Sequence, residues 1–443
     1  MQFPPYFIQR MKKQLGPDWE NFAQAHRKEA PVSLRVHPLK WRDELADELP
    51  RMEPIPWCEQ GYYLTERPHF ARQVLWHAGA YYVQEASSML LAHLLAQIKL
   101  PQNAFVLDLG ASPGGKSTLL LDYLPKGSIL LANEPLRNRL PALRENLQRW
   151  GYPNVLISQH QASEITASGC QFDLILIDVP CSGEGLFRKR PEAVKEWNEQ
   201  QADFCALRQT KIIQDILPAL KSGGHLIYST CTYNPNENEK QVKGLVKEGF
   251  REIHPEFPSA WQIERRSLGY QCYPHQVKGE GFYFALLQKE IKTERHAVSS
   301  QPKPTSSNWK SSNKKTKEQL STWLPNIQER VVLENPRHGF FALLPEHAEK
   351  ALHLLSRLRR CRPIAEAARL KGKLLRPAPA SALQIDWHAK TNRYELSAEE
   401  AQAWLRGSPP TNPLEKRGYL LLTYRQLPLA WAKGVPGRMN LLK

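Results

Sequence analysis

Two cysteines separated by fifty positions are the residues of this chain best placed for covalent chemistry. Cys181 follows the apolar run FDLILI, and Cys231 follows the run HLIYST. Both runs resemble buried strands, so we expect the two sulfur atoms to emerge at the same edge of one sheet. Two thiols in one cleft suit a reaction that needs a nucleophile and a second group for proton transfer or release. The alternative is that both are inert core side chains, because free cysteine is often buried.

A glycine-rich loop follows the strand-like run AFVLDL and allows two interpretations. It matches the phosphate-loop pattern GxxxxGK[ST], which would make the protein a nucleotide hydrolase. It also fits the first strand-turn-helix of a Rossmann-like methyltransferase, where small residues let S-adenosylmethionine (SAM) lie over the strand end. The loop residues are Gly110, Ala111, Ser112, Pro113, Gly114, Gly115 and Lys116.

Three acidic residues near the loop favour SAM over ATP. Asp108 lies at the strand end, ahead of the loop. Glu134 directly follows the run SILLAN, where an acid that binds ribose hydroxyls is expected. Asp178 has the place of a magnesium-binding residue, but it continues into Pro-Cys-Ser-Gly, which a magnesium site does not need.

The elements that would hold these residues alternate between strand-like and helix-like stretches from about residue 103 to 289. The expected strands are 104–109, 128–133, 154–158, 172–177, 223–230 and 281–288. The expected helices start near Gly115, Arg137, Gln201 and Asn236. This alternation predicts an α/β fold with a mostly parallel, doubly wound sheet.

Composition divides the chain into four parts. Residues 1–95 are mixed and predict a small α+β module, and 96–290 form the α/β domain that carries the candidate site residues. Residues 291–322 are rich in Ser, Pro and Lys and predict a flexible basic linker in which Trp309 is exposed. Residues 323–443 predict a further domain of α+β type.

Charge and cysteine content limit the partners and the location. The net charge of +16 favours a polyanion such as nucleic acid. No apolar run is long enough to cross a membrane and the start lacks a signal-peptide pattern, so we expect a cytoplasmic protein without membrane contact. Seven cysteines without a CxxC pair predict reduced thiols and no metal site. We expect a monomer.

Four motifs together resemble the Sun-type family of RNA cytosine-C5 methyltransferases. They are DLGASPGGKST, DVPCSGEGLFRKRPEA, GGHLIYSTCTYNPNENE and YPHQVKGEGFYFALLQK, and GAYYVQEASSM precedes them. The similarity covers residues 79–289 in the family's order. The segment GYLLLTYRQLPLAWAKGVPGRMNLLK resembles the PUA-like tail of the bacterial small-subunit rRNA member. The resemblance implies that the parts 1–95 and 323–443 bind RNA, and that Arg357–Arg360, Lys371, Lys373 and Arg376 of the second part contact phosphates.

The resemblance implies a role for each motif residue. Cys231 would add to carbon 6 of the cytosine, so that carbon 5 can take the SAM methyl group, and Cys181 would help to release the product. Asp178 would contact the ring edge and Lys116 would lie between cofactor and base.

The cofactor residues follow from the same resemblance. The loop 110–116 and Glu134 would hold SAM, with Asp178 at the edge of this site. Gln161 stands where relatives carry an aspartate that reads the adenine amino group. Its side-chain oxygen can still accept that hydrogen bond.

Several alternatives remain open at this level. Small-subunit (16S) rRNA is the preferred substrate, and tRNA is the second candidate. DNA cytosine-C5 methyltransferases use the Pro-Cys cysteine as nucleophile, which would exchange the roles of Cys181 and Cys231. A phosphate-loop NTPase that acts on RNA is the rival enzyme class, and a catalytically silent RNA-binding protein is the third possibility.

Overall fold

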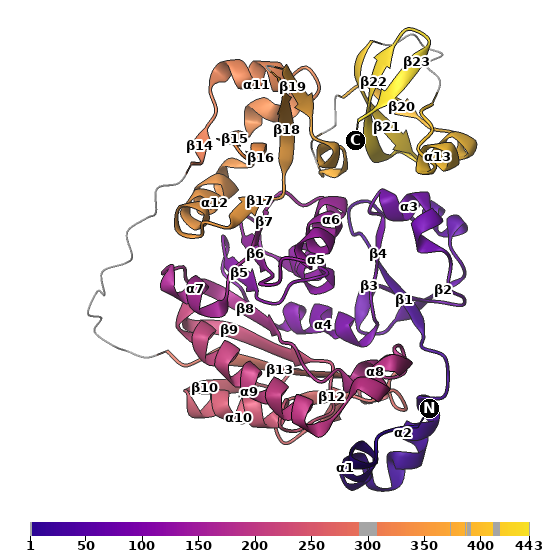
Figure 1. Ribbon diagram of the computed structural model, residues 1–443, viewed down its shortest axis with the longest axis vertical. Coiled ribbons are helices and arrows are strands. Elements are labelled where there is room, and N and C mark those ends of the chain that lie inside the picture. Colours follow the sequence, from indigo (N-terminus) through magenta and orange to yellow (C-terminus); the bar gives the residue numbers. More distant parts are fainter. Residues whose placement is uncertain are drawn as a thin grey trace.

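The computed structural model describes residues 2–291, 308–372, 374–385, 387, 391–410 and 417–442. Its centre is one large sheet with the N-terminal module on one side and the C-terminal region above it (Figure 1). Within the described residues, no helix is long and apolar enough to cross a membrane, and no group of three or more His, Cys, Asp or Glu is arranged to hold a metal ion.

The central sheet confirms the predicted α/β fold. Its parallel strands are β5 (Phe105–Asp108), β6 (Ile129–Asn133), β7 (Val155–Ser158), β8 (Phe172–Asp178) and β9 (Leu220–Thr230). Its antiparallel strands are β10 (Phe250–Ile253), β11 (Glu264–Arg265), β12 (Tyr270–Cys272), β13 (Phe282–Lys289) and β17 (Cys361–Pro363). The order is β11-β12-β13-β9-β8-β5-β6-β7-β17, and β10 pairs with β13. All six predicted strands occur in it.

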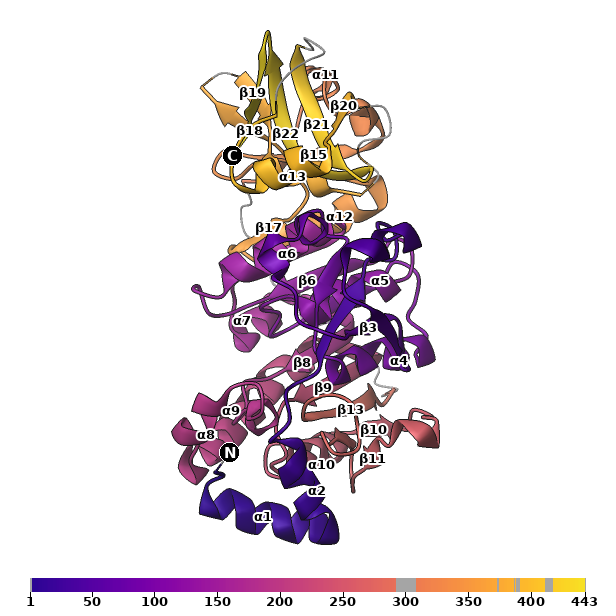
Figure 2. The same cartoon turned by 90° about the vertical axis from the view of Figure 1, so that its right-hand side faces the viewer.

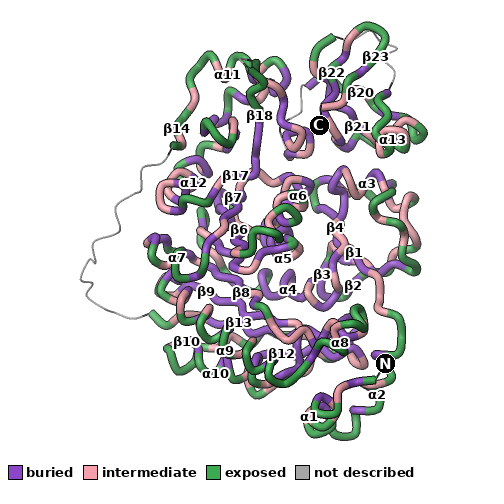
Figure 3. Tube along the Cα trace, in the orientation of Figure 1, coloured by how far each residue is buried: buried purple, intermediate pink, exposed green. Residues whose placement is uncertain are grey.

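Helices cover both faces of this sheet, and their leucines and isoleucines form two separate core clusters. One face carries α4 (Leu90–Gln97), α5 (Gly115–Tyr123) and α6 (Leu140–Trp150). The other carries α7 (Ala162–Ala167), α9 (Glu199–Ile216) and α10 (Glu239–Lys247). Figure 3 shows the strands buried between exposed helix surfaces. All four predicted helix starts lie within three residues of the observed starts of α5, α6, α9 and α10.

The N-terminal module contains α1 (Pro5–Leu15), α2 (Trp19–Ala25) and a sheet of four strands. The strands are β1 (Val32–Val36), β2 (Met52–Ile55), β3 (Cys58–Leu64) and β4 (Tyr81–Val83). Both views place α1 and α2 at the end of the molecule opposite the C-terminal sheets (Figure 2). The predicted boundary at residue 95 falls inside α4, because the leucines of this helix pack in the catalytic core.

The C-terminal region forms two sheets instead of the single predicted domain. The first contains β14 (Lys310–Ser311), β15 (Val331–Asn335), β16 (Gly339–Leu343), β18 (Glu366–Lys371) and β19 (Leu374–Pro377), with α11 (Lys314–Leu320) and α12 (Pro345–Arg357). The second contains β20 (Arg393–Glu395), β21 (Gly418–Tyr424), β22 (Leu427–Val435) and β23 (Arg438–Leu441), with α13 (Ala398–Leu405).

The predicted linker, residues 291–322, contains secondary structure in its second half. Residues 308–322 carry β14 and α11, because Leu320 is fully buried and provides an apolar anchor that the surrounding lysines obscure in the sequence. Trp309 is half-buried and stacks on His338, so its predicted exposure is wrong. Residues 292–307 lie outside the described residues.

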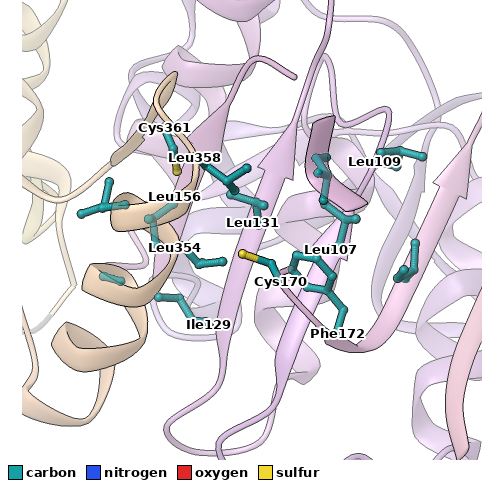
Figure 4. Packing of buried hydrophobic residues seen from close by; sticks show 14 of the residues in the cluster. Leu107, Leu109, Ile129, Leu131, Leu156, Cys170, Phe172, Leu354, Leu358 and Cys361 are labelled. Carbon is teal, nitrogen blue, oxygen red and sulfur yellow. The ribbon is translucent and has the colours of Figure 1, made fainter. Parts of the chain in front are cut away.

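The C-terminal region also completes the central sheet, since β17 pairs antiparallel with β7. Figure 4 shows Leu354 of α12 and Leu358 just after it packed toward Leu131 and Leu156 of the central strands. The predicted basic helix ends at Arg357, and the arginines that follow belong to the turn before β17. Lys373 lies outside the described residues.

Candidate functional site

A pocket of about 760 Å³ opens at the carboxyl ends of the parallel strands. Strand ends of a doubly wound sheet are the usual place for ligands, because the loops there diverge to opposite faces. The predicted site residues that line the pocket are Gly110, Ala111, Ser112, Pro113, Gly115, Lys116, Glu134, Gln161, Asp178, Cys181 and Cys231. Gly114 is part of the same loop but does not line the pocket.

The two cysteines meet in this pocket. Their Sγ atoms are 3.1 Å apart, although Cys181 follows β8 and Cys231 follows β9. The neighbouring Cys231 sulfur and burial both raise the pKa of the Cys181 thiol well above its usual value. Cys181 is therefore held as a protonated thiol, which suits a hydrogen-bond donor better than a nucleophile.

A partly buried ion pair lies beside the thiols. Lys116 Nζ is 2.8 Å from Asp178 Oδ2, and Ser229 Oγ donates to Asp178 Oδ1 at 2.9 Å. Burial opposes the charge on Lys116, but the Asp178 carboxylate outweighs it and raises the lysine pKa. The ammonium also interacts electrostatically with Cys231.

The glycine loop allows a close approach between two strands. A Cβ on Gly110 would lie 2.3 Å from the carbonyl oxygen of Asp178, so only glycine fits there without displacing the β8 end. Gly114 has a φ of +113°, in the left-handed region that favours glycine. The loop thus presses against the strand that carries Asp178.

Glu134 lies in the part of the pocket next to the glycine loop and offers a carboxylate oxygen without a hydrogen bond. Its Oε1 accepts the Leu136 N–H at 2.9 Å, which holds the turn after β6 and delays the start of α6. Its Oε2 is buried without a hydrogen bond, and the Arg139 guanidinium is 3.5 Å away. A buried acceptor without a donor indicates a ligand hydroxyl at this position.

Gln161 lies at the far rim of this pocket. It is exposed and occupies the N-cap position of α7, where its N–H donates to Glu164 at 2.7 Å. Asp108 lies below the loop, and burial raises its pKa to about 7 although Ser117 donates to it at 2.5 Å.

Glu237 is a residue whose role the sequence did not reveal. Its buried carboxylate accepts the Ser182 N–H at 2.8 Å and the Ser182 hydroxyl at 2.5 Å, which fixes the backbone next to Cys181. Gln209 of α9 donates to the same carboxylate at 3.3 Å. In the sequence, Glu237 resembles an ordinary residue before a helix, and only the fold brings it to the Cys181 turn.

Stability should depend on pH through Glu237. Burial raises its pKa to about 7, although hydrogen bonds from Ser182 oppose the shift. Between pH 4.5 and about 7 the unfolded chain binds fewer protons at this site than the folded one, so stability falls as pH rises and then levels off. We expect a loss of about 3 kcal/mol. Calorimetric unfolding from pH 5 to pH 8 should show a shallower fall for Glu237→Gln, and equal slopes would contradict this.

The fold and the pocket together define a class of protein. A parallel sheet with a glycine loop after β5 and an acid after β6 is a Rossmann-type domain that binds a nucleoside cofactor. Family models match three segments: 16S rRNA methyltransferase RsmB/F at residues 95–288, the N-terminal domain of 16S rRNA methyltransferase RsmF at 3–86, and the RsmF PUA domain at 391–441.

Relatives match over nearly the whole chain. Ribosomal RNA small subunit methyltransferase F of Erwinia tasmaniensis is 30% identical over 99% of this chain and 95% of that protein. The Escherichia coli protein of the same name shows the same identity and the same coverage. The chain therefore belongs to the RsmB/F family of rRNA methyltransferases. The predicted resemblance is confirmed, with the PUA part confined to the second C-terminal sheet.

Solved structures share the fold. A methyltransferase homologue from Pyrococcus horikoshii has a TM-score of 0.57 and 26% identity, covering 65% of this chain and 95% of that one. NSun6 from Pyrococcus horikoshii, solved with SFG, has a TM-score of 0.56 and 22% identity, covering 66% and 99%.

Proposed function

We propose that the protein transfers a methyl group from SAM to carbon 5 of a cytosine in RNA, with 16S rRNA as the substrate. The observation that carries this proposal is the contact between Cys181 and Cys231, 3.1 Å apart beside the Lys116–Asp178 pair. Family membership supports rRNA over tRNA. It also argues against the phosphate-loop hydrolase, as does the engagement of Lys116 with Asp178.

Cys231 is the nucleophile in this proposal. Its thiolate adds to carbon 6, which makes carbon 5 electron-rich enough to form a bond to the methyl group. The Lys116 ammonium interacts electrostatically with Cys231, and Asp178 faces the polar edge of the ring. The DNA-type assignment is disfavoured, because a second cysteine, Cys231, follows its own strand and lines the same pocket as Cys181.

Cys181 serves the release step. After methyl transfer, carbon 5 gives its proton to solvent water, the electron pair of that C–H bond re-forms the double bond between carbons 5 and 6, and the bond between carbon 6 and Cys231 breaks with the pair leaving on sulfur. The Cys181 thiol, 3.1 Å away, donates a hydrogen bond to the departing thiolate and stabilises it.

SAM supplies an activated methyl group on a positively charged sulfur, and the chain offers groups that fit its other parts. The unsatisfied Oε2 of Glu134 suits a ribose hydroxyl. Gly110 has no side chain, so the loop packs closely against the Asp178 carbonyl at the strand end. Gln161 lines the rim where the adenine would lie. In NSun6, the same fold accommodates SFG, a SAM analogue.

Replacing Glu134 with glutamine should weaken SAM binding by about 10- to 100-fold, because a charge-assisted hydrogen bond is worth roughly 1.5–3 kcal/mol. Isothermal titration with SAM measures the change. Glu248→Gln alters an exposed carboxylate after α10 and should bind SAM like the unchanged protein. Equal SAM affinities of the two variants would contradict a role of Glu134 in cofactor binding.

The function itself is tested by mapping methylated cytosines. Purified protein, SAM and either a 16S rRNA transcript or a tRNA pool are incubated, and bisulfite sequencing locates 5-methylcytosine. We expect one modified position in rRNA and none in tRNA. Modification of tRNA alone would reverse the substrate assignment. Transfer of methyl groups from SAM to RNA without any 5-methylcytosine would overturn the cytosine chemistry.

A further inference from the structure

A second pocket lies where the C-terminal region joins the central sheet. Its volume is about 520 Å³, and its walls come from the start of α6, the end of β7, and the turn and strand of β17. Five arginines line it: Arg137, Arg144, Arg359, Arg360 and Arg362. Two come from the catalytic domain and three from the C-terminal region, so only the pairing of β17 with β7 creates the cluster.

The positive charge of this arginine pocket is poorly compensated. Arg360 pairs with Glu164 at 2.7 Å and donates to the Gln159 carbonyl at 2.7 Å. No ion pair joins the other four arginines to any residue within the described parts of the chain. Guanidinium groups held together in a concavity without carboxylates favour an anion.

Arg362 shows the effect of this crowding. Burial lowers its pKa, and the Arg144 guanidinium lowers it further. Glu366 is the acidic group that opposes the shift, but its carboxylate is paired with Arg369 at 2.5 Å. An anion bound between Arg144 and Arg362 would relieve the repulsion between them.

The remaining lining combines apolar and aromatic side chains with the polar residues Ser158 and Gln159. Leu140, Pro141 and Ile157 contribute carbon surface, and His338 stacks on Trp309 with ring centres 5.9 Å apart. Phosphate on guanidinium and sugar or base on apolar surface is the usual division of contacts in RNA recognition. A nucleotide chain fits this mixture better than an acidic peptide does.

The arginine pocket is too far from the cysteines to take part in catalysis. Five strand-to-strand steps separate β9 from β17 in the sheet order, which corresponds to about 24 Å. The two pockets adjoin along the chain, since Gln159 lines one and the next two residues, His160 and Gln161, line the other. One RNA molecule can therefore cross both.

We propose that the arginine pocket binds backbone phosphates of the substrate RNA at a distance from the target cytosine and thereby sets which cytosine reaches Cys231. The inference rests on the proposed function for its ligand. It predicts contributions to RNA affinity and register, with no contribution to SAM binding or to the chemical step.

Two double variants test the pocket. Arg137→Gln/Arg359→Gln removes two exposed arginines, and Arg144→Gln/Arg362→Gln removes the two half-buried ones. Each should weaken binding of a 16S rRNA transcript by about 10- to 100-fold near 150 mM salt and reduce the salt slope by about 2, because two phosphate contacts are lost. Turnover at saturating RNA and SAM affinity should stay unchanged.

Lys243→Gln/Lys247→Gln is the matched control, because it removes the same charge from exposed positions of α10. If the exposed-arginine variant, with an unchanged melting temperature, binds RNA like this control, the pocket does not hold the substrate. The same conclusion follows if inorganic phosphate binds there without competing with RNA. An unchanged protein that binds no rRNA would instead overturn the proposed function.

Discussion

Replacing Cys231 with alanine is expected to abolish methyl transfer to RNA while SAM binding stays intact. Without the sulfur, carbon 5 of cytosine remains too poor a nucleophile, and we expect turnover to fall on the order of 10⁴-fold or more. The cofactor half of the pocket, at Glu134 and the glycine loop, is formed by β5 and β6 and does not depend on this side chain. Transfer of labelled methyl groups to RNA measures the loss, and calorimetric titration measures SAM binding.

Cys205→Ala provides the control for this experiment. Cys205 is half-buried on α9, does not line the catalytic pocket, and has a pKa raised by burial to about 11. Its loss should leave turnover unchanged. If Cys231→Ala keeps its activity while Cys181→Ala loses it, the nucleophile is the Pro-Cys cysteine and the DNA-type assignment holds.

Replacing Cys181 with alanine is expected to trap the enzyme on its RNA. Cys231 would still add to carbon 6, and the methyl group would still be transferred. The departing sulfur would then lack the hydrogen bond from the thiol 3.1 Å away, so release would slow more than addition. Denaturing electrophoresis should show a stable protein–RNA band, and turnover should stop after one cycle.

The double variant Cys181→Ala/Cys231→Ala decides whether this band is the expected adduct. It should show no band, because the attacking sulfur is gone. A band that survives in the double variant would come from another residue. If Cys181→Ala turns over repeatedly and shows no protein–RNA band, Cys181 has no role in the release step.

Much of the central sheet was predictable from local patterns. The apolar runs before Asp108, Asp178 and Cys231 are strands because β-branched and aliphatic residues pack well on both buried faces of a parallel sheet. Strand ends at one edge then bring Asp178, Cys181 and Cys231 together, as predicted. The four predicted helix starts lie within three residues of the observed ones.

Other features depended on contacts between distant segments. Glu237 resembles a residue ahead of a helix, and its bond to Ser182 exists only because β8 and β9 are neighbours. The extent of the linker was wrong because Leu320 is a single apolar residue among lysines, and its burial depends on the sheet it meets. The strand β17 is too short to stand out in the sequence.

The sequence by itself determined the two thiols, the glycine loop and the sheet edge that unites them, because motif chemistry and strand periodicity are local properties. Only the tertiary structure decided how the thiols differ. The short distance between the sulfurs and burial raise the pKa of the Cys181 thiol, while the Lys116 ammonium, paired with Asp178, interacts electrostatically with Cys231. Only the tertiary structure joins arginines from two domains into one pocket, because charge density in a concavity depends on which segments meet there.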